Sequence, residues 1–99
     1  MNEGGVMKPI KDLLPFNAWS QERIKQGRKS CTSRTERYND PRVFHITVFK
    51  LDTVKYFLYD REGADSPEEF EKVWRSIHRG KFDGEQKVYV HFGNFKRVV

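Results

Sequence analysis

The chain has a single cysteine, Cys31. One cysteine excludes an internal disulfide and is typical of proteins from a reducing compartment. No apolar run approaches the roughly 18 residues that a membrane-spanning helix needs, and no signal-peptide pattern is visible. We therefore expect a cytoplasmic protein with no membrane partner.

Motifs for metals and cofactors are also missing. The three histidines and Cys31 show none of the spacings that zinc sites use. The sequence contains no glycine-rich phosphate loop and no nucleophile elbow. We expect no metal and no cofactor, and we interpret His45 and His91 as strand residues with ordinary hydrogen bonds.

The composition indicates one small domain. Ninety-nine residues leave no room for a second core, and we expect a flexible leader at residues 1–8 and a single domain at residues 9–99. Aromatic residues make up 14% of the chain, which is too many for a disordered protein. The net charge of +5 favours a polyanionic partner, nucleic acid first. A highly charged, solvated surface is the alternative.

Two helices have clear start and stop signals. Asn17 is a predicted N-cap for a helix over residues 18–26, and Gly27 ends that helix. Trp19 and Ile24 are its expected buried residues. The second helix starts at the Ser66-Pro67 capping pattern. It carries one apolar stripe, spaced for a helix and expected to pack in the core: Phe70, Val73, Trp74 and Ile77.

Three segments are predicted to be strands: residues 29–34, 42–51 and 87–92. The last alternates well, with Val88, Val90 and Phe92 on one face and Tyr89 and His91 on the other. Alternation in residues 42–51 is imperfect, which indicates burial on both faces or a bulge. Residues 53–59 are ambiguous, and we favour a short helix there. The fold class is α+β, on a mostly antiparallel sheet or a partial barrel.

The segment from Lys29 to Arg34 is the candidate site because it is extended, basic and rich in hydroxyls. Lys29 can lower the proton affinity of a hydroxyl such as that of Thr32, or act as a base if burial lowers its own pKa. Glu62 is a candidate for the proton shuttle. Lys29 and Thr32 can converge only if Lys29 precedes the pairing or a bulge intervenes. A solvated basic strand is the alternative.

Two blocks of the sequence resemble the ASCH domain family, a branch of the PUA-like superfamily. The first block covers residues 16–20 and 24–34, where a short helix ends in glycine and is followed by Lys-Ser-Cys-Thr-Ser-Arg. The second is the acidic, glycine-containing connector and helix start at residues 62–70. The resemblance implies a small β-barrel flanked by helices, with a cleft between the lysine-containing strand and the connector.

The resemblance also implies two kinds of function. The superfamily is associated with RNA binding and modified-base recognition. Some bacterial ASCH proteins are amidohydrolases that deacetylate acetylated cytidine with a Lys, a Thr and a Glu, and another is a ribonuclease. Carried over by position, Thr32 would attack the amide carbonyl, Lys29 would activate it, and Glu62 would assist proton transfer. Arg34 would hold the cleft geometry or a ligand phosphate.

One departure from the family pattern concerns the barrel. ASCH domains usually have two strands between the first block and the connector helix, and this chain has room for one, at residues 43–51. The predicted fold is therefore a shortened member of the family. Its exposed edge would need cover from the N-terminal segment or from a second copy in a homodimer.

The leading hypothesis is a domain that binds RNA or a nucleotide in a basic cleft. The residues expected to meet phosphates are Arg23, Arg28, Lys29, Arg34 and Arg37. Tyr38 is the better candidate for stacking on a base, because Trp19 is more often a core residue. The alternatives are an amidohydrolase that uses Lys29, Thr32 and Glu62, a ribonuclease, and a protein-interaction module.

Overall fold

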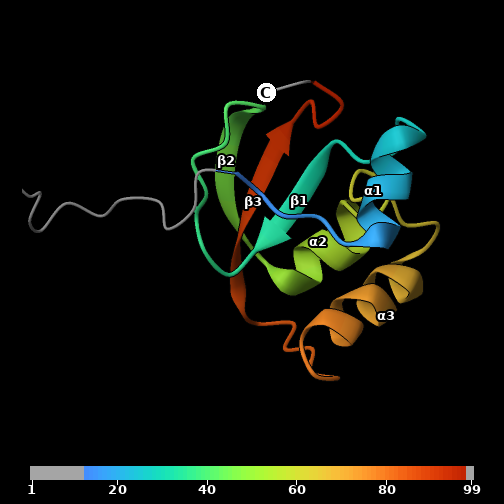
Figure 1. Cartoon of the computed structure of the whole chain (residues 1–99). Helices are drawn as coiled ribbons and strands as arrows, with labels where there is room; N and C mark the ends of the chain where they lie inside the picture. The colour runs from blue at the N-terminus through green and yellow to red at the C-terminus, as the bar shows by residue number, and fades with distance from the viewer. Residues whose placement is uncertain (1–12, 98–99) are drawn as a thin grey trace, which may run out of the picture.

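A computed structural model describes residues 13–97 of the chain. The predicted leader at residues 1–8 and the start of the predicted domain lie outside the described residues. Figure 1 shows three helices gathered on one side of a three-stranded antiparallel sheet. The elements in chain order are α1 (Ala18–Lys25), β1 (Cys31–Arg34), β2 (Val43–Lys50), α2 (Leu51–Phe57), α3 (Pro67–Ile77) and β3 (Lys87–Gly93). The predicted α+β class is confirmed. In residues 13–97, no helix is both long and apolar enough to cross a membrane.

Both predicted helix caps form. The Asn17 side chain accepts a hydrogen bond from the backbone N–H of Ser20, and the Ser66 side chain accepts one from Glu69. Gly27 follows α1 with φ of 75°, a conformation that glycine adopts without steric cost. The segment predicted to be a short helix is α2, which begins two residues earlier than expected.

The burial of the helix residues differs from the prediction. In α1 the buried residue is Ser20, whereas Trp19 and Ile24 are only half-buried. In α3, Phe70 and Trp74 are buried as expected, but Ile77 is 55% exposed. Phe70 and Trp74 of the predicted apolar stripe therefore pack in the core, whereas the C-terminal end of the stripe, at Ile77, lies at the surface.

β3 is the central strand, with β1 and β2 on its two sides. Both pairings are antiparallel, and Thr32 and Ile46 lie opposite His91 from either side. The register of β2 shifts between Val43 and His45, at a β-bulge or a similar irregularity, whereas residues 45–50 pair regularly with β3. β1 begins at Cys31, so Lys29 precedes the pairing, which is one of the two conditions for its convergence with Thr32.

A hydrophobic cluster packs on each face of the sheet. The larger one lies between the sheet and the helices, and its buried members are Cys31, Leu51, Val54, Ala64, Phe70, Trp74, Val88 and Val90. The smaller one contains Leu14, Tyr38 and Phe95. This smaller cluster buries Tyr38, which was expected to be available for stacking on a base. It also buries His91, which lies on the face of β3 opposite to Val88 and Val90.

His91 satisfies its hydrogen bonds within this smaller cluster, as predicted for a strand histidine. Its Nε2 accepts a hydrogen bond from the backbone N–H of Tyr38, and its Nδ1 donates to the carbonyl oxygen of Tyr89. Burial lowers the pKa of His91, which keeps the ring neutral and leaves Nε2 able to accept.

Asp40 fastens the loop before β2 to the N-terminal segment. Its carboxylate accepts hydrogen bonds from the backbone N–H of Leu14 and from the backbone and guanidinium of Arg42. Burial alone would raise the pKa of Asp40, but these hydrogen bonds outweigh it and hold the pKa at about 2.

We expect this carboxylate to make stability depend on acid pH. Because the native pKa is about 2 and the ordinary value is 3.8, the contribution is present above pH 3.8 and is lost as the pH falls toward 2. The loss should be on the order of 1–2 kcal/mol in the free energy of unfolding. Urea denaturation of the wild type and Asp40→Asn at pH 2 to 6 measures it. A stability difference between the two proteins that is the same at both ends of this range would contradict the prediction.

Candidate functional site

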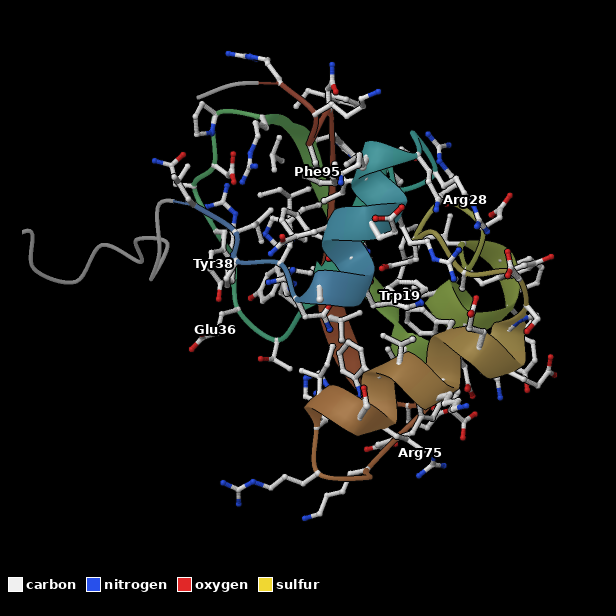
Figure 2. The ribbon with its side chains drawn as sticks, turned by 45° about the vertical axis from the view of Figure 1, so that its right-hand side comes forward. Trp19, Arg28, Glu36, Tyr38, Arg75 and Phe95 are labelled. Carbon is white, nitrogen blue, oxygen red and sulfur yellow. The ribbon has the colours of Figure 1, made fainter. Side chains whose placement is uncertain are left out.

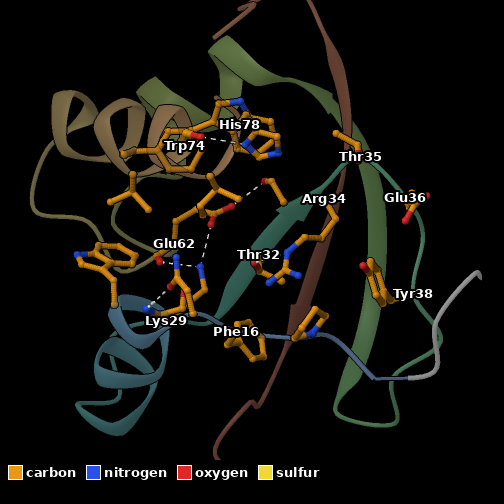
Figure 3. Close-up of a pocket in the computed structure, with 18 residues that line it drawn as sticks. Phe16, Lys29, Thr32, Arg34, Thr35, Glu36, Tyr38, Glu62, Trp74 and His78 are labelled. Atoms are coloured by element: carbon orange, nitrogen blue, oxygen red, sulfur yellow. Dashed lines mark hydrogen bonds and ion pairs between the residues drawn. The ribbon is translucent and has the colours of Figure 1, made fainter. Parts of the chain in front are cut away.

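A pocket of about 430 Å³ lies beside β1, at the edge of the sheet where the two hydrophobic clusters approach each other. We call it the sheet-edge pocket. Figure 3 shows Trp74 of α3 and His78, which follows α3, on one side of it and Phe16 on the other, with Lys29, Glu62 and Thr32 between them. Further residues of the lining include Trp19, Ser33, Arg34, Glu36 and Tyr38.

A buried ion pair forms part of the pocket lining. The Lys29 ammonium donates hydrogen bonds to the backbone oxygen and to Oε1 of Glu62, each at 2.9 Å. Ser33 Oγ donates to the other carboxylate oxygen, Oε2 of Glu62, at 2.6 Å. The side chains of Lys29 and Glu62 are only 3% and 5% exposed. The structure therefore places two of the three predicted catalytic residues in direct contact, and adds a hydroxyl that the sequence analysis did not assign.

The backbone explains why these distant residues meet. The backbone N–H groups of Ser30 and Cys31 both donate to the carbonyl oxygen of Arg61, which ties the connector to the start of β1. Two residues after Arg61, Gly63 has φ of 98°, and a Cβ added to Gly63 would lie 2.9 Å from Cβ of Arg23. Only glycine fits this turn comfortably against α1. Glu62 is consequently held in place from both sides.

Thr32 lines the same pocket but has a different environment. Its Oγ1 accepts a hydrogen bond from Nε of Arg34 at 3.3 Å, and no hydrogen bond joins it to Lys29 or Glu62 among the described residues. Thr32 pairs with His91 and Ser33 pairs with Val90, so the two hydroxyls leave opposite faces of β1. Ser33 is therefore on the face of the larger cluster, where Glu62 lies.

Arg34 lies against aromatic rings at one end of the pocket. Its guanidinium is 5.2 Å from the ring centre of Phe16 and 5.9 Å from that of Tyr38, within cation–π range. Burial lowers the pKa of Arg34, and the negative charge of Glu62 acts against that shift. Arginine remains charged in proteins, so this side chain is a partly buried cation at the pocket.

Aromatic rings form the apolar walls. The rings of Trp74 and His78 stack at 3.9 Å with an interplanar angle of 16°, and Nδ1 of His78 lies 2.9 Å from the Trp74 carbonyl oxygen. Trp19 packs against the larger cluster and also lines the pocket. Tyr38 lines the pocket too, but is only 9% exposed, so the turn that contains it is less open than the sequence indicates.

The predicted phosphate-binding cations are not brought together. Arg23 pairs with Glu69 at 3.3 Å and Arg28 pairs with Asp65, and neither arginine lines the sheet-edge pocket. Figure 2 shows Arg28 and Tyr38 on opposite sides of the molecule in that view. Arg37 lies at a separate depression near β2.

The charges in the lining balance, with two cations and two carboxylates. Its cations are Lys29 and Arg34, and its carboxylates are Glu36 and Glu62. Of these two cations, Lys29 is paired with Glu62, and Arg34 has no carboxylate partner in the lining. The pocket is therefore less basic than the cleft that the sequence predicts.

Ser33 and His78 are pocket residues that sequence reasoning missed, and Trp74 was expected only in the core. The alternation of β1 carries a signal for Ser33, because it shares a face with the buried Cys31 whereas Thr32 does not. His78 follows the last apolar residue of α3, and nothing in the sequence distinguishes it from an ordinary helix-ending residue.

Residues 13–97 contain no cluster of histidine, cysteine, aspartate and glutamate side chains that could hold a metal ion. No protein-family model, curated protein or solved structure matches the chain.

We expect the buried ion pair to be essential for stability. Lys29→Met leaves the Glu62 carboxylate buried with Ser33 as its remaining side-chain partner. Removing one member of a buried pair costs about 3–5 kcal/mol in the free energy of unfolding. Urea denaturation monitored by circular dichroism measures this loss.

Two further variants separate the effect of the pair from that of the lysine alone. Lys29→Met combined with Glu62→Gln removes both charges and keeps an acceptor for Ser33, so we expect much of the lost stability to return. Lys50→Met removes a lysine whose pairing with Glu85 is exposed, and should change the unfolding midpoint little. A Lys29→Met protein as stable as Lys50→Met would contradict the prediction.

Proposed function

We propose that this chain is an ASCH-like domain that binds a nucleobase in the sheet-edge pocket, carried by a nucleotide or by single-stranded RNA. The observation that carries the proposal is the combination of aromatic walls with a polar, hydrogen-bonding floor in a pocket of about 430 Å³. Small-molecule sites typically have this volume, mostly apolar walls and a few polar groups that fix the ligand.

The half-buried rings at the pocket suit a flat ligand. Phe16, Trp19 and His78 each line the pocket and retain some exposed surface. Proteins that bind unpaired bases stack them on such rings and read their edges by hydrogen bonding. The hydroxyl of Thr32 and the guanidinium of Arg34 supply donors and acceptors at the same pocket.

The resemblance to ASCH domains gives further support. The lysine, threonine and glutamate that the resemblance singles out are Lys29, Thr32 and Glu62, and all three line one pocket although Glu62 is 33 positions from Lys29. A three-stranded antiparallel sheet with accompanying helices is compatible with a shortened PUA-like fold.

Intrinsic fluorescence provides the test of binding, because both tryptophans of the chain line the pocket. Titration with the four ribonucleoside monophosphates, with N4-acetylcytidine and with a short single-stranded RNA should change the emission. Phe16→Ala should weaken binding about 10- to 100-fold, the effect of losing one stacking ring. Phe57→Ala is the matched control, since Phe57 is 76% exposed and lies outside the pocket lining.

The RNA titration also tests the phosphate contacts. If Arg34 and Arg37 each neutralise one phosphate, log K should fall with log salt with a slope of about −1.4, from about −0.7 per contact on a single strand. Salt-independent RNA binding would reject these contacts. An emission that no ligand changes, or equal affinities for Phe16→Ala and Phe57→Ala, would contradict the binding proposal itself.

Amide hydrolysis at the same pocket is the second candidate function. The observation that favours it is the buried carboxylate of Glu62, which contacts both an ammonium and a hydroxyl within the lining. Such contacts are characteristic of sites where a base activates a nucleophile. In the assignment that the resemblance implies, Thr32 is the nucleophile, with Lys29 and Glu62 assisting proton transfer.

Release of acetate from N4-acetylcytidine, followed by chromatography, tests the reaction. Glu62→Gln should lower turnover by at least about 10²-fold, because an amide cannot take up the proton of a nucleophile. Gln retains the size and one acceptor of Glu but leaves the Lys29 ammonium buried without a counter-charge, so the variant should lose stability, and circular dichroism at the assay temperature must show that the assayed protein is folded. The reaction is rejected if the wild type releases no acetate or if Glu62→Gln matches it.

A further inference from the structure

We infer that Ser33, rather than Thr32, is the nucleophile of this pocket; the inference rests on the amide hydrolysis proposed above. The geometry that points to it is the 2.6 Å hydrogen bond from Ser33 Oγ to Oε2 of Glu62. A nucleophilic hydroxyl must lie within hydrogen-bond reach of the group that takes its proton. Ser33 meets that condition in this structure.

Thr32 does not have the same arrangement. Its Oγ1 is an acceptor for Nε of Arg34 at 3.3 Å, and a neighbouring cation of this kind offers no site for the hydroxyl proton because arginine has no acceptor. Thr32 also faces away from the larger cluster, because Thr32 and its partner in β3, His91, lie on the opposite face of the sheet. The base, the ammonium and the hydroxyl converge only on the side of Ser33.

Burial strengthens the interactions on that side. Ser33 is 7% exposed, Glu62 4% and Lys29 7%, and all three line the pocket. Electrostatic interactions act more strongly in such a desolvated setting. Burial, with Glu62 as a secondary cause, raises the pKa of the adjacent Cys31 thiol, which indicates the same low-polarity environment.

Lys29 can stabilise the oxyanion of such a reaction. An ammonium carries three protons, and among the described residues two of them are donated to the backbone oxygen and Oε1 of Glu62. The third is available for the oxygen of a carbonyl that approaches Ser33. Lys29 thus holds the base in place and supplies positive charge where negative charge develops.

The proposed reaction balances with water as the second substrate. Ser33 Oγ attacks the carbonyl carbon of an acyl amide while its proton moves to Oε2 of Glu62. The C–N bond then breaks, the amine leaves with that proton, and the acyl group remains as an ester on Ser33. Water attacks the ester, gives its proton to Glu62 and releases the carboxylic acid. The proton finally returns to Ser33.

The test locates the acyl group. The protein is mixed with p-nitrophenyl acetate, an activated acetyl donor, quenched in acid within seconds, digested and sequenced by tandem mass spectrometry. We expect acetyl on Ser33 in the wild type and in Thr32→Ala, and its loss from this peptide in Ser33→Ala. Turnover of N4-acetylcytidine should fall at least about 10³-fold in Ser33→Ala, the scale seen when a nucleophile is removed.

A conservative variant separates a nucleophile from a residue that merely supports Glu62. Ser33→Cys replaces the hydroxyl by a thiol, and should carry the acetyl group as a thioester on Cys at position 33. Acetyl found on Thr32, or acetate released with no acyl-enzyme, would overturn the inference and leave amide hydrolysis standing. Absence of both acyl-enzyme and turnover would reject the hydrolysis together with the inference. Tryptophan fluorescence decides nucleobase binding independently of either result.

Discussion

The buried ion pair of Lys29 and Glu62 is the interaction on which the site depends. It joins the segment before β1 to the connector before α3, and the hydrogen bonds from Ser30 and Cys31 to Arg61 reinforce the same junction. A buried pair of this kind gains its value from complete hydrogen bonding, since either charge alone would be costly. Here Glu62 accepts three hydrogen bonds. Lys29 donates two of them, to the backbone oxygen and to Oε1, and Ser33 donates the third, to Oε2.

The pocket exists because the sheet is narrow. With three strands, one cluster on each face and β1 at the edge, the two clusters leave a space between them that the strand does not fill. The polar side chains of β1 therefore border a pocket whose other walls come from both hydrophobic layers. Apolar walls and a charged floor arise from the same packing arrangement.

Much of the fold could be predicted from local signals. Capping at Asn17 and Ser66, the glycine at position 27 and the alternation in β3 each depend on a few neighbouring residues, and each is found in the structure. Burial on the outer face of the sheet could not be predicted in this way. It depends on the chain before α1 and the turn around Tyr38 folding over His91, and no periodicity in the sequence describes that contact.

The candidate site was predictable in part for the same reason. The chemistry of Lys29 and its position before the strand are local properties, and Glu62 was proposed as the proton shuttle from the residues and again through the resemblance. The charge balance was not predictable, because Arg23 pairs with Glu69 of α3 and Arg28 pairs with Asp65 of the connector, and both carboxylates are distant in the sequence. The basic total of the chain therefore overstates the charge available at the pocket.

The bulge in β2 has a consequence for how the molecule meets other chains. β2 is the second edge strand, and an eight-residue edge with exposed side chains such as Phe44 and Val48 would otherwise be a template for adding a foreign strand. A bulge breaks the regular spacing of backbone donors and acceptors, and Lys50 places a charge at the end of the strand. The irregularity at Val43–His45 thus limits strand addition to the regular part of this edge, residues 45–50, where Lys50 supplies the charge.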